Sequence, residues 1–345
     1  MALSIFDFIK LKSVMHEREF NSWEDLFFNK RKLEFKNRGS GRVTGELKPD
    51  KINRSETKVT YNIGTLSRSF IDFECLDVEQ LTTNTNEFQL GLRFCPVKAI
   101  KNKNQNDEIV SYSELLKLIE RVETYYCLNA SDLKFIAPEL SFNFIADSKI
   151  KEKFFEGGRF LIFKDAPLKK INNDATGELM GYKAIKGHFT FKFYCVDEKY
   201  GTSNNHFRME RQYTRTQTFS RKSGIKTLED VKDPGKMVKC IDILVSDLDD
   251  LIIYDPHIVI PKERKVGIIE KRILDQAHDP SFWLKTKETR DDATFNTYLK
   301  KYRNLSKEFG DDLHGKIKSM LLNERREFED LADERKKTSA FVTCS

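Results

Sequence analysis

Long apolar runs are missing from this sequence of 345 residues. No stretch approaches the roughly 18 apolar residues that a membrane-spanning helix needs. At the start of the chain, Asp7 and Lys10 interrupt the sequence before a hydrophobic segment typical of signal peptides can form. Internal repeats and low-complexity tracts are absent as well. We therefore expect a cytoplasmic globular protein with no membrane partner.

Cysteine and histidine are scarce, with six residues of each. No two cysteines have the C-x-x-C spacing, and the histidines form neither an H-x-H pair nor an H-E-x-x-H motif. The spacings typical of zinc and redox sites are therefore absent. We expect the cysteines to be free thiols in a reducing compartment.

Charge is plentiful and unevenly distributed. The net charge is +6, charged residues make up 33% of the chain, and 27 phenylalanines provide material for a large core. Residues 151–226 contain sixteen Lys/Arg and eight Asp/Glu, whereas the following stretch, 229–255, is acidic. A basic block in a folded region attracts a phosphate backbone, because each neutralised phosphate releases counterions. A solvated charged face is the alternative interpretation of the same block.

Helical periodicity is clearest in two places. In residues 111–126 apolar side chains recur at helical spacing, and Ser111 or Ser113 is positioned to cap the helix. Residues 284–337 are typical of two or three charged helices with a break near Gly310. The apolar stripe of these helices has the spacing of a core face, and a partner-binding face is the alternative.

Three strands are predicted where large apolar residues alternate with polar ones. In the first, Leu140, Phe142 and Phe144 share one face, so Glu139, Ser141 and Asn143 share the other. The same alternation governs residues 188–194 and 206–210, with a turn-rich link between them. If the three strands join one sheet, its face opposite the phenylalanines carries Glu139, Asn143, Lys192, Tyr194, Arg208 and Glu210.

This polar face combines two carboxylates, two cations and a phenol. Carboxylates hold a divalent cation through oxygen, cations neutralise the charge of a phosphate, and a phenol is a nucleophile. The combination is what phosphoryl transfer requires. An ordinary solvent-facing sheet would have a similar pattern, and periodicity alone does not separate the two.

Five short motifs follow one another along roughly residues 1–310. They are Asp7-Phe8-Ile9-Lys10-Leu11, Glu139 with Asn143, Lys192-Phe193-Tyr194, Phe207-Arg208-Met209-Glu210, and Gly224-Ile225-Lys226-Thr227-Leu228-Glu229-Asp230. Each motif alone is weakly specific, but in this order they resemble the rolling-circle replication initiators of plasmids and filamentous phages.

The resemblance implies an enzyme that nicks and rejoins DNA at a replication origin. Tyr194 would attack a phosphodiester and keep the 5′ end as a phosphotyrosine. Glu139 and Glu210 would bind Mg²⁺ or Mn²⁺, and Lys192 and Arg208 would lie against phosphates. Relatives of this kind commonly act as dimers, so a homodimer is expected.

The sequence departs from the family directly after the proposed nucleophile. The Asp and Lys that usually follow the tyrosine are Cys195 and Val196 here. Asp197, Glu198 and Lys199 are positioned to substitute if the strand ends early. Tyr200 and Tyr213 are the alternative nucleophiles. A second interpretation is an origin-binding protein that no longer cuts.

Further basic residues follow the third strand. With Tyr213 and Phe219 interleaved, they match a track that holds single-stranded DNA by charge and stacking; a solvated basic edge is the alternative. The DNA-binding set is Lys192, Arg208, Arg211, Arg215, Arg221, Lys222 and Asn143.

The predicted fold class is α+β, with a central antiparallel sheet, flanking helices and a charged helical C-terminal extension. We expect an initiator-like region at residues 1–283, with sub-domains near 1–130 and 131–283, and the extension at 284–345. A third functional interpretation is an interaction protein whose C-terminal helices recruit a helicase or self-associate.

Overall fold

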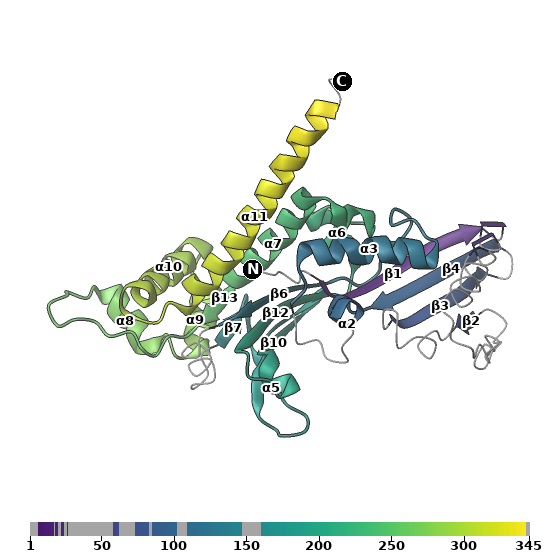
Figure 1. Ribbon diagram of the computed structural model, residues 1–345. Coiled ribbons are helices and arrows are strands. Elements are labelled where there is room, and N and C mark those ends of the chain that lie inside the picture. Colours follow the sequence, from purple (N-terminus) through teal and green to yellow (C-terminus); the bar gives the residue numbers. More distant parts are fainter. Residues whose placement is uncertain are drawn as a thin grey trace. The chain divides into compact units, whose positions relative to one another are not determined.

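The computed structural model describes residues 6–16, 18–19, 22–23, 26, 58–61, 73–82, 85–101, 109–146 and 160–342 (Figure 1). It is an α+β structure of antiparallel strands and helices, as the sequence predicted. The chain forms two compact units. The first consists of residues 1–140 and 212–239, and the second of residues 141–211 and 240–345.

The first unit is built on a β-sheet. Its strands are β1 (Phe6–His16), β2 (Lys58–Tyr61), β3 (Phe73–Thr82) and β4 (Thr85–Phe94), in the order β2-β3-β4-β1. The short strand β5 (Lys134–Phe135) pairs with β1, and the start of β6 (Glu139–Ile145) does the same through Phe8 and Glu139. The motif that opens the chain therefore lies in a central strand.

Helices complete this unit: α2 (Pro96–Lys101), α3 (Tyr112–Tyr126), α6 (Thr216–Ser223), the 3₁₀ helix η1 (Glu229–Lys232) and the start of α7 (Pro234–Asp249). The predicted cap of α3 is confirmed, because Ser111 and Glu114 form a capping box. The buried face of α3 contains Leu115, Leu118, Ile119 and Val122. Tyr112 donates a hydrogen bond to the Val231 carbonyl (3.0 Å), which ties α3 to η1.

The second unit contains most of the three predicted strands. Its main sheet has the order β6-β12-β11-β10-β9, with β9 (Lys169–Asn172), β10 (Leu179–Lys186), β11 (Phe189–Cys195) and β12 (His206–Tyr213). The link between β11 and β12, expected as a turn, contains the helix α5 (Val196–Tyr200). A smaller sheet is formed by β7 (Phe160–Phe163), β8 (Ala166–Pro167) and β13 (Leu251–Ile253). Phenylalanines line the buried face as predicted, and Phe163 stacks on Phe191 with ring centroids 4.2 Å apart.

Four helices end the second unit: α8 (Ile268–Gln276), α9 (Pro280–Thr289), α10 (Asp292–Phe309) and α11 (Leu313–Val342). The expected break at Gly310 is confirmed, since this residue caps α10. The helical stripe is core, because Phe295, Leu299 and Tyr302 pack around the buried Trp283. The helix α11 begins beside α10 and runs outward to the end of the described chain (Figure 1).

Among the described residues, no helix is long and apolar enough to cross a membrane. The predicted boundary at residue 284 lies inside α9, and both β6 and β12 contribute residues to each unit.

Candidate functional site

The strands of the second unit bring five of the predicted site residues into one polar cluster, which we call the Tyr194 cluster. It consists of Asn143 on β6, Lys192 and Tyr194 on β11, and Arg208 and Glu210 on β12, together with His206. Alternate residues of neighbouring strands share a face of the sheet, which is why these side chains meet.

The hydroxyl of Tyr194 donates a hydrogen bond to Oε1 of Glu210. The other oxygen of the same carboxylate accepts a hydrogen bond from Nζ of Lys192, at 2.9 Å. Glu210 therefore links the phenol to a cation. A carboxylate in direct contact with a phenol is positioned to accept its proton.

Arg208 connects this pair to β6. Its Nη1 lies 3.4 Å from the Tyr194 hydroxyl and 3.8 Å from Oε1 of Glu210, and its Nε donates to Oδ1 of Asn143. A ring nitrogen of His206 lies 3.1 Å from the same Asn143 oxygen. The sequence analysis did not assign His206 to the site. The alternation of residues 206–210 would have placed it on this face.

All members of the cluster are buried except Lys192, which is half-buried. Tyr194 is 5% exposed, Glu210 1% and Arg208 0%. The interpretation of this face as an ordinary solvent-facing sheet is therefore wrong. Buried charges persist only when they are paired, and the contacts within the cluster provide that pairing.

The strand β11 ends at Cys195, directly after Tyr194. Such an early end is the condition under which Asp197, Glu198 or Lys199 was expected to replace the missing Asp and Lys. Val196 is buried at the start of α5, and Asp197 accepts hydrogen bonds from the Thr202 hydroxyl (2.7 Å) and the His206 amide (3.4 Å). Lys199 is exposed, and its ammonium lies 5.6 Å from the centroid of the Tyr194 ring. Asp197 thus stabilises the loop through its hydrogen bonds. Lys199 is a cation beside the Tyr194 ring, although it does not occupy either of the two positions directly after the tyrosine.

The basic residues of the predicted DNA track, which begins inside β12, differ in their exposure. Arg211 is buried, its guanidinium pairs with Asp247 and lies 3.6 Å from the centroid of the Phe189 ring, which favours a structural role. Burial raises the pKa of Asp247 to about 6, against the lowering effect of Arg211. Arg215, Arg221 and Lys222 are exposed, at the start of α6 and in its last turn.

The aromatic part of that track is not available to bases. Tyr213 and Phe219 are 1% and 0% exposed and pack against each other, with ring centroids 5.4 Å apart. Neither ring therefore offers an open face for stacking.

A second group of potential metal ligands, which the sequence analysis did not find, lies between β13 and α11. Asp255, His257 and Asp311 have ligand atoms within 4.8 Å of one another, close enough to bind one metal ion. Nδ1 of His257 is 2.7 Å from Oδ2 of Asp311. Asp311 lies 54 positions after His257 in the sequence, so no short spacing motif predicts this group.

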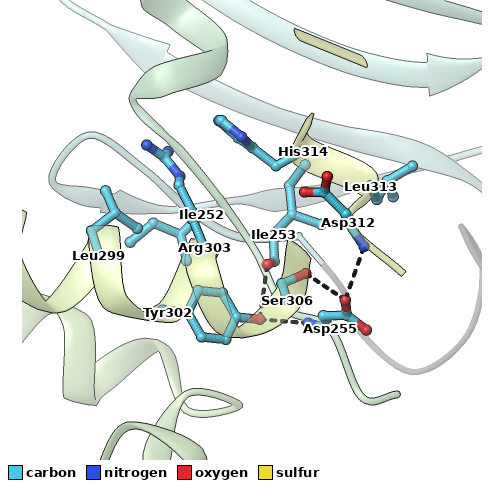
Figure 2. Close-up of a pocket in the computed structure, with 10 residues that line it drawn as sticks. All are labelled: Ile252, Ile253, Asp255, Leu299, Tyr302, Arg303, Ser306, Asp312, Leu313 and His314. Atoms are coloured by element: carbon cyan, nitrogen blue, oxygen red, sulfur yellow. Dashed lines mark hydrogen bonds between the residues drawn. The ribbon is translucent and has the colours of Figure 1, made fainter. Parts of the chain in front are cut away.

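Figure 2 shows Asp255 as the centre of a hydrogen-bond network next to a small cavity. Its Oδ2 accepts from the Ser306 hydroxyl (2.5 Å) and from the amides of Asp311 (2.7 Å) and Asp312 (3.3 Å), and its own amide donates to the Tyr302 hydroxyl. With its oxygen engaged in this way, Asp255 holds together the turn between α10 and α11. These hydrogen bonds stabilise the buried carboxylate, so its burial needs no metal ion as an explanation.

The predicted metal ligands Glu139 and Glu210 are poorly placed to bind one metal ion together. Glu139 is buried at the start of β6 in the first unit, and both oxygens of Glu210 are engaged by Tyr194 and Lys192. Among the described residues, neither belongs to a group of three closely spaced ligands. We therefore derive no chemical step through a metal ion at these residues.

Comparisons with known proteins give distant likenesses to solved structures alone. No protein-family model matches the chain, and no curated protein sequence matches it. A solved structure of a rolling circle replication initiator protein from Geobacillus stearothermophilus is similar with a TM-score of 0.29 and 12% identity, covering 66% of this chain and 73% of that chain. A likeness at this level carries no argument about function, so the proposal below rests on the residues themselves.

Proposed function

We propose that this protein is a replication initiator that nicks and rejoins one DNA strand through Tyr194. The observation that supports the proposal is the contact of the Tyr194 hydroxyl with the Glu210 carboxylate and the Arg208 guanidinium. These are residues that the resemblance names, and they come from two different strands.

In the proposed reaction, Glu210 takes the phenolic proton as the Tyr194 oxygen attacks the phosphorus. The bond from phosphorus to the 3′ oxygen breaks, the 3′ oxygen receives a proton from water, and the 5′ phosphate stays on the tyrosine. A free phenol has a pKa of about 10, so an acceptor for its proton and a neighbouring cation are both needed near neutral pH. Arg208 and Lys192 supply positive charge for the phosphate oxygens.

Access of DNA to the hydroxyl needs a rearrangement. Because Tyr194 is 5% exposed, a phosphate reaches its oxygen only after the side chains around it move. We propose that DNA binding drives this opening. Dependence on Mg²⁺ or Mn²⁺, which the resemblance implies, stays a prediction.

The test is the covalent intermediate. Single-stranded DNA carrying the origin, or a random pool, is incubated with the protein and Mg²⁺ or Mn²⁺ and then denatured in detergent. DNA labelled at its 3′ end should yield a labelled protein adduct, whereas DNA labelled at its 5′ end should not.

The matched variants are Tyr194→Phe and Tyr254→Phe, the second being a half-buried tyrosine that directly follows β13. The adduct should disappear with Tyr194→Phe and persist with Tyr254→Phe. An adduct that survives Tyr194→Phe would contradict the assignment and move the chemistry to Tyr200 or Tyr213.

The burial of the cluster favours a second candidate function, an origin-binding protein that does not cleave. In that case the network of Tyr194, Glu210 and Arg208 only stabilises the sheet. It predicts no adduct, DNA binding that weakens steeply with salt, and a lower melting temperature for Tyr194→Phe. Recruitment of a helicase and dimerisation stay predictions.

A further inference from the structure

A polar hollow with a cavity volume of ≈ 460 Å³ lies among the helices α8, α9 and α10. Its lining shares no residue with the Tyr194 cluster. The residues that matter are three exposed cations, Arg272, Lys285 and Arg290, and the half-buried ring of Tyr298.

The three cations make no ion pair with any described residue. The one carboxylate in the lining, Asp279, accepts hydrogen bonds from the Ser281 amide (2.8 Å) and hydroxyl (2.5 Å). The lining therefore has an excess of positive charge, which Asp279, near Lys285, and Asp291, beside Arg290, offset only in part. Such an excess at a concave surface concentrates anions.

The charge is gathered there by the fold. Residues 268–301 contain seven Lys/Arg and six Asp/Glu, which is close to balance. The hollow nevertheless collects three of the cations and one carboxylate. Arg272 lies on α8, Lys285 on α9, and Arg290 at the C-terminal end of α9. Because they come from different places, the three cations suit an extended polyanion better than a single phosphate.

The ring of Tyr298 adds an aromatic surface beside the three cations. Tyr298 stacks beside the buried Phe282, with ring centroids 6.4 Å apart, which holds the ring in place at the edge of the hollow. A fixed ring next to backbone-binding cations is the combination that single-strand-binding surfaces use.

We propose that this hollow binds single-stranded nucleic acid, with Arg272, Lys285 and Arg290 on the phosphates and a base against Tyr298. The proposal needs no strand cleavage and therefore stands separately from the proposed reaction at Tyr194. In a nicking enzyme it would retain the displaced strand.

The test is equilibrium binding of a fluorescent oligo(dT), longer than the roughly 4–16 nucleotides that a single-strand-binding fold covers, in EDTA at several salt concentrations. The variant Arg272→Gln/Lys285→Gln/Arg290→Gln should bind at least tenfold more weakly. The slope of log K against log salt concentration should become less negative by about 2, since each phosphate contact to a single strand contributes about 0.7 to that slope.

The control is Lys262→Gln/Lys265→Gln/Lys337→Gln, which removes three exposed cations outside the hollow. It should retain most of the affinity. Equal losses in the two triple variants would overturn the proposal in favour of unspecific attraction to net charge, and so would an unchanged affinity in the first.

Two further arms identify the ligand. Tyr298→Leu should weaken oligo(dT) binding severalfold with the salt dependence unchanged, because stacking releases no counterions. Inorganic phosphate and dTMP should not displace the oligonucleotide at equal phosphate concentration; displacement by either would identify a site for a free phosphate and overturn the proposal. Binding of oligo(dT) is measured in EDTA and involves no cleavage, so failure to form the covalent adduct would concern only the proposed reaction.

Discussion

The hydrogen bond between the Tyr194 hydroxyl and Glu210 determines which single substitution separates catalysis from binding. In Glu210→Gln the side chain keeps its shape and loses the carboxylate that accepts the phenolic proton. General-base catalysis typically contributes about 10²–10⁴-fold, so adduct formation should slow by at least 10²-fold. Single-turnover adduct assays and DNA-binding titrations check this.

The matched control for Glu210→Gln is Glu120→Gln, which removes an exposed carboxylate of α3 at a position with no assigned role in the reaction. It should form adduct at the normal rate. An equal loss of DNA affinity and of rate in Glu210→Gln would instead indicate a binding defect.

A second residue-scale prediction concerns His314, which is half-buried on α11 and lies 3.1 Å from the Leu248 carbonyl. Burial, followed by the nearby Arg303, lowers the pKa of His314 to about 4, although Asp249 acts in the opposite direction and Lys318 adds to the lowering. Between pH 6.5 and pH 4 the unfolded chain therefore binds a proton that the folded chain does not. Stability is lost as pH falls through this window, by on the order of 2–3 kcal/mol from this group.

Urea unfolding at pH 7 and pH 4.5 tests this contribution. His314→Gln keeps a hydrogen-bond donor for the Leu248 carbonyl and cannot titrate, so its free energy of unfolding should fall less between the two pH values than that of the unchanged protein. Parallel pH dependences of the two proteins would show that His314 does not titrate in this way.

At the scale of the elements, the spacing of β10 and β11 depends on Gly181. This residue pairs with Tyr194, and a Cβ at position 181 would collide with the Phe193 carbonyl and with the Cα and Cβ of Tyr194. Gly181→Ala should force the two strands apart, at a cost of about 1–3 kcal/mol, which is typical of overpacking. It should also slow adduct formation, because it displaces the proposed nucleophile.

Gly187→Ala is the control, because a Cβ there meets nothing within 4 Å. Chemical denaturation should distinguish the two variants clearly. If both are equally stable, the close approach of β10 to Tyr194 does not constrain the sheet.

At the scale of the whole molecule, treatment with EDTA tests the dependence on Mg²⁺ or Mn²⁺ that the resemblance implies. Removal of divalent ions should abolish the adduct and leave DNA binding in place. His257→Ala/Asp311→Asn removes two members of the group around Asp255, whose carboxylate already has hydrogen-bond donors from the protein. This variant should retain the metal-dependent adduct, and its loss would transfer the metal site to that group.

Local patterns in the sequence were sufficient for much of the fold. Alternation located β6, β11 and β12, and helical spacing with Ser111 located α3, because side-chain direction follows backbone period. The same alternation placed Tyr194, Arg208 and Glu210 on one face. These features depend on residues close together in the chain.

Burial, pairing and long-range juxtaposition were decided by the tertiary structure alone. Whether a polar face is covered depends on what packs over it, so the sequence left the solvent-facing interpretation of the Tyr194 cluster open. Arg211 meets Asp247 36 residues away, and Asp255 meets Ser306 51 residues away, pairings that no spacing rule encodes. The two units are likewise discontinuous in the chain, because compactness is a property of contacts in space.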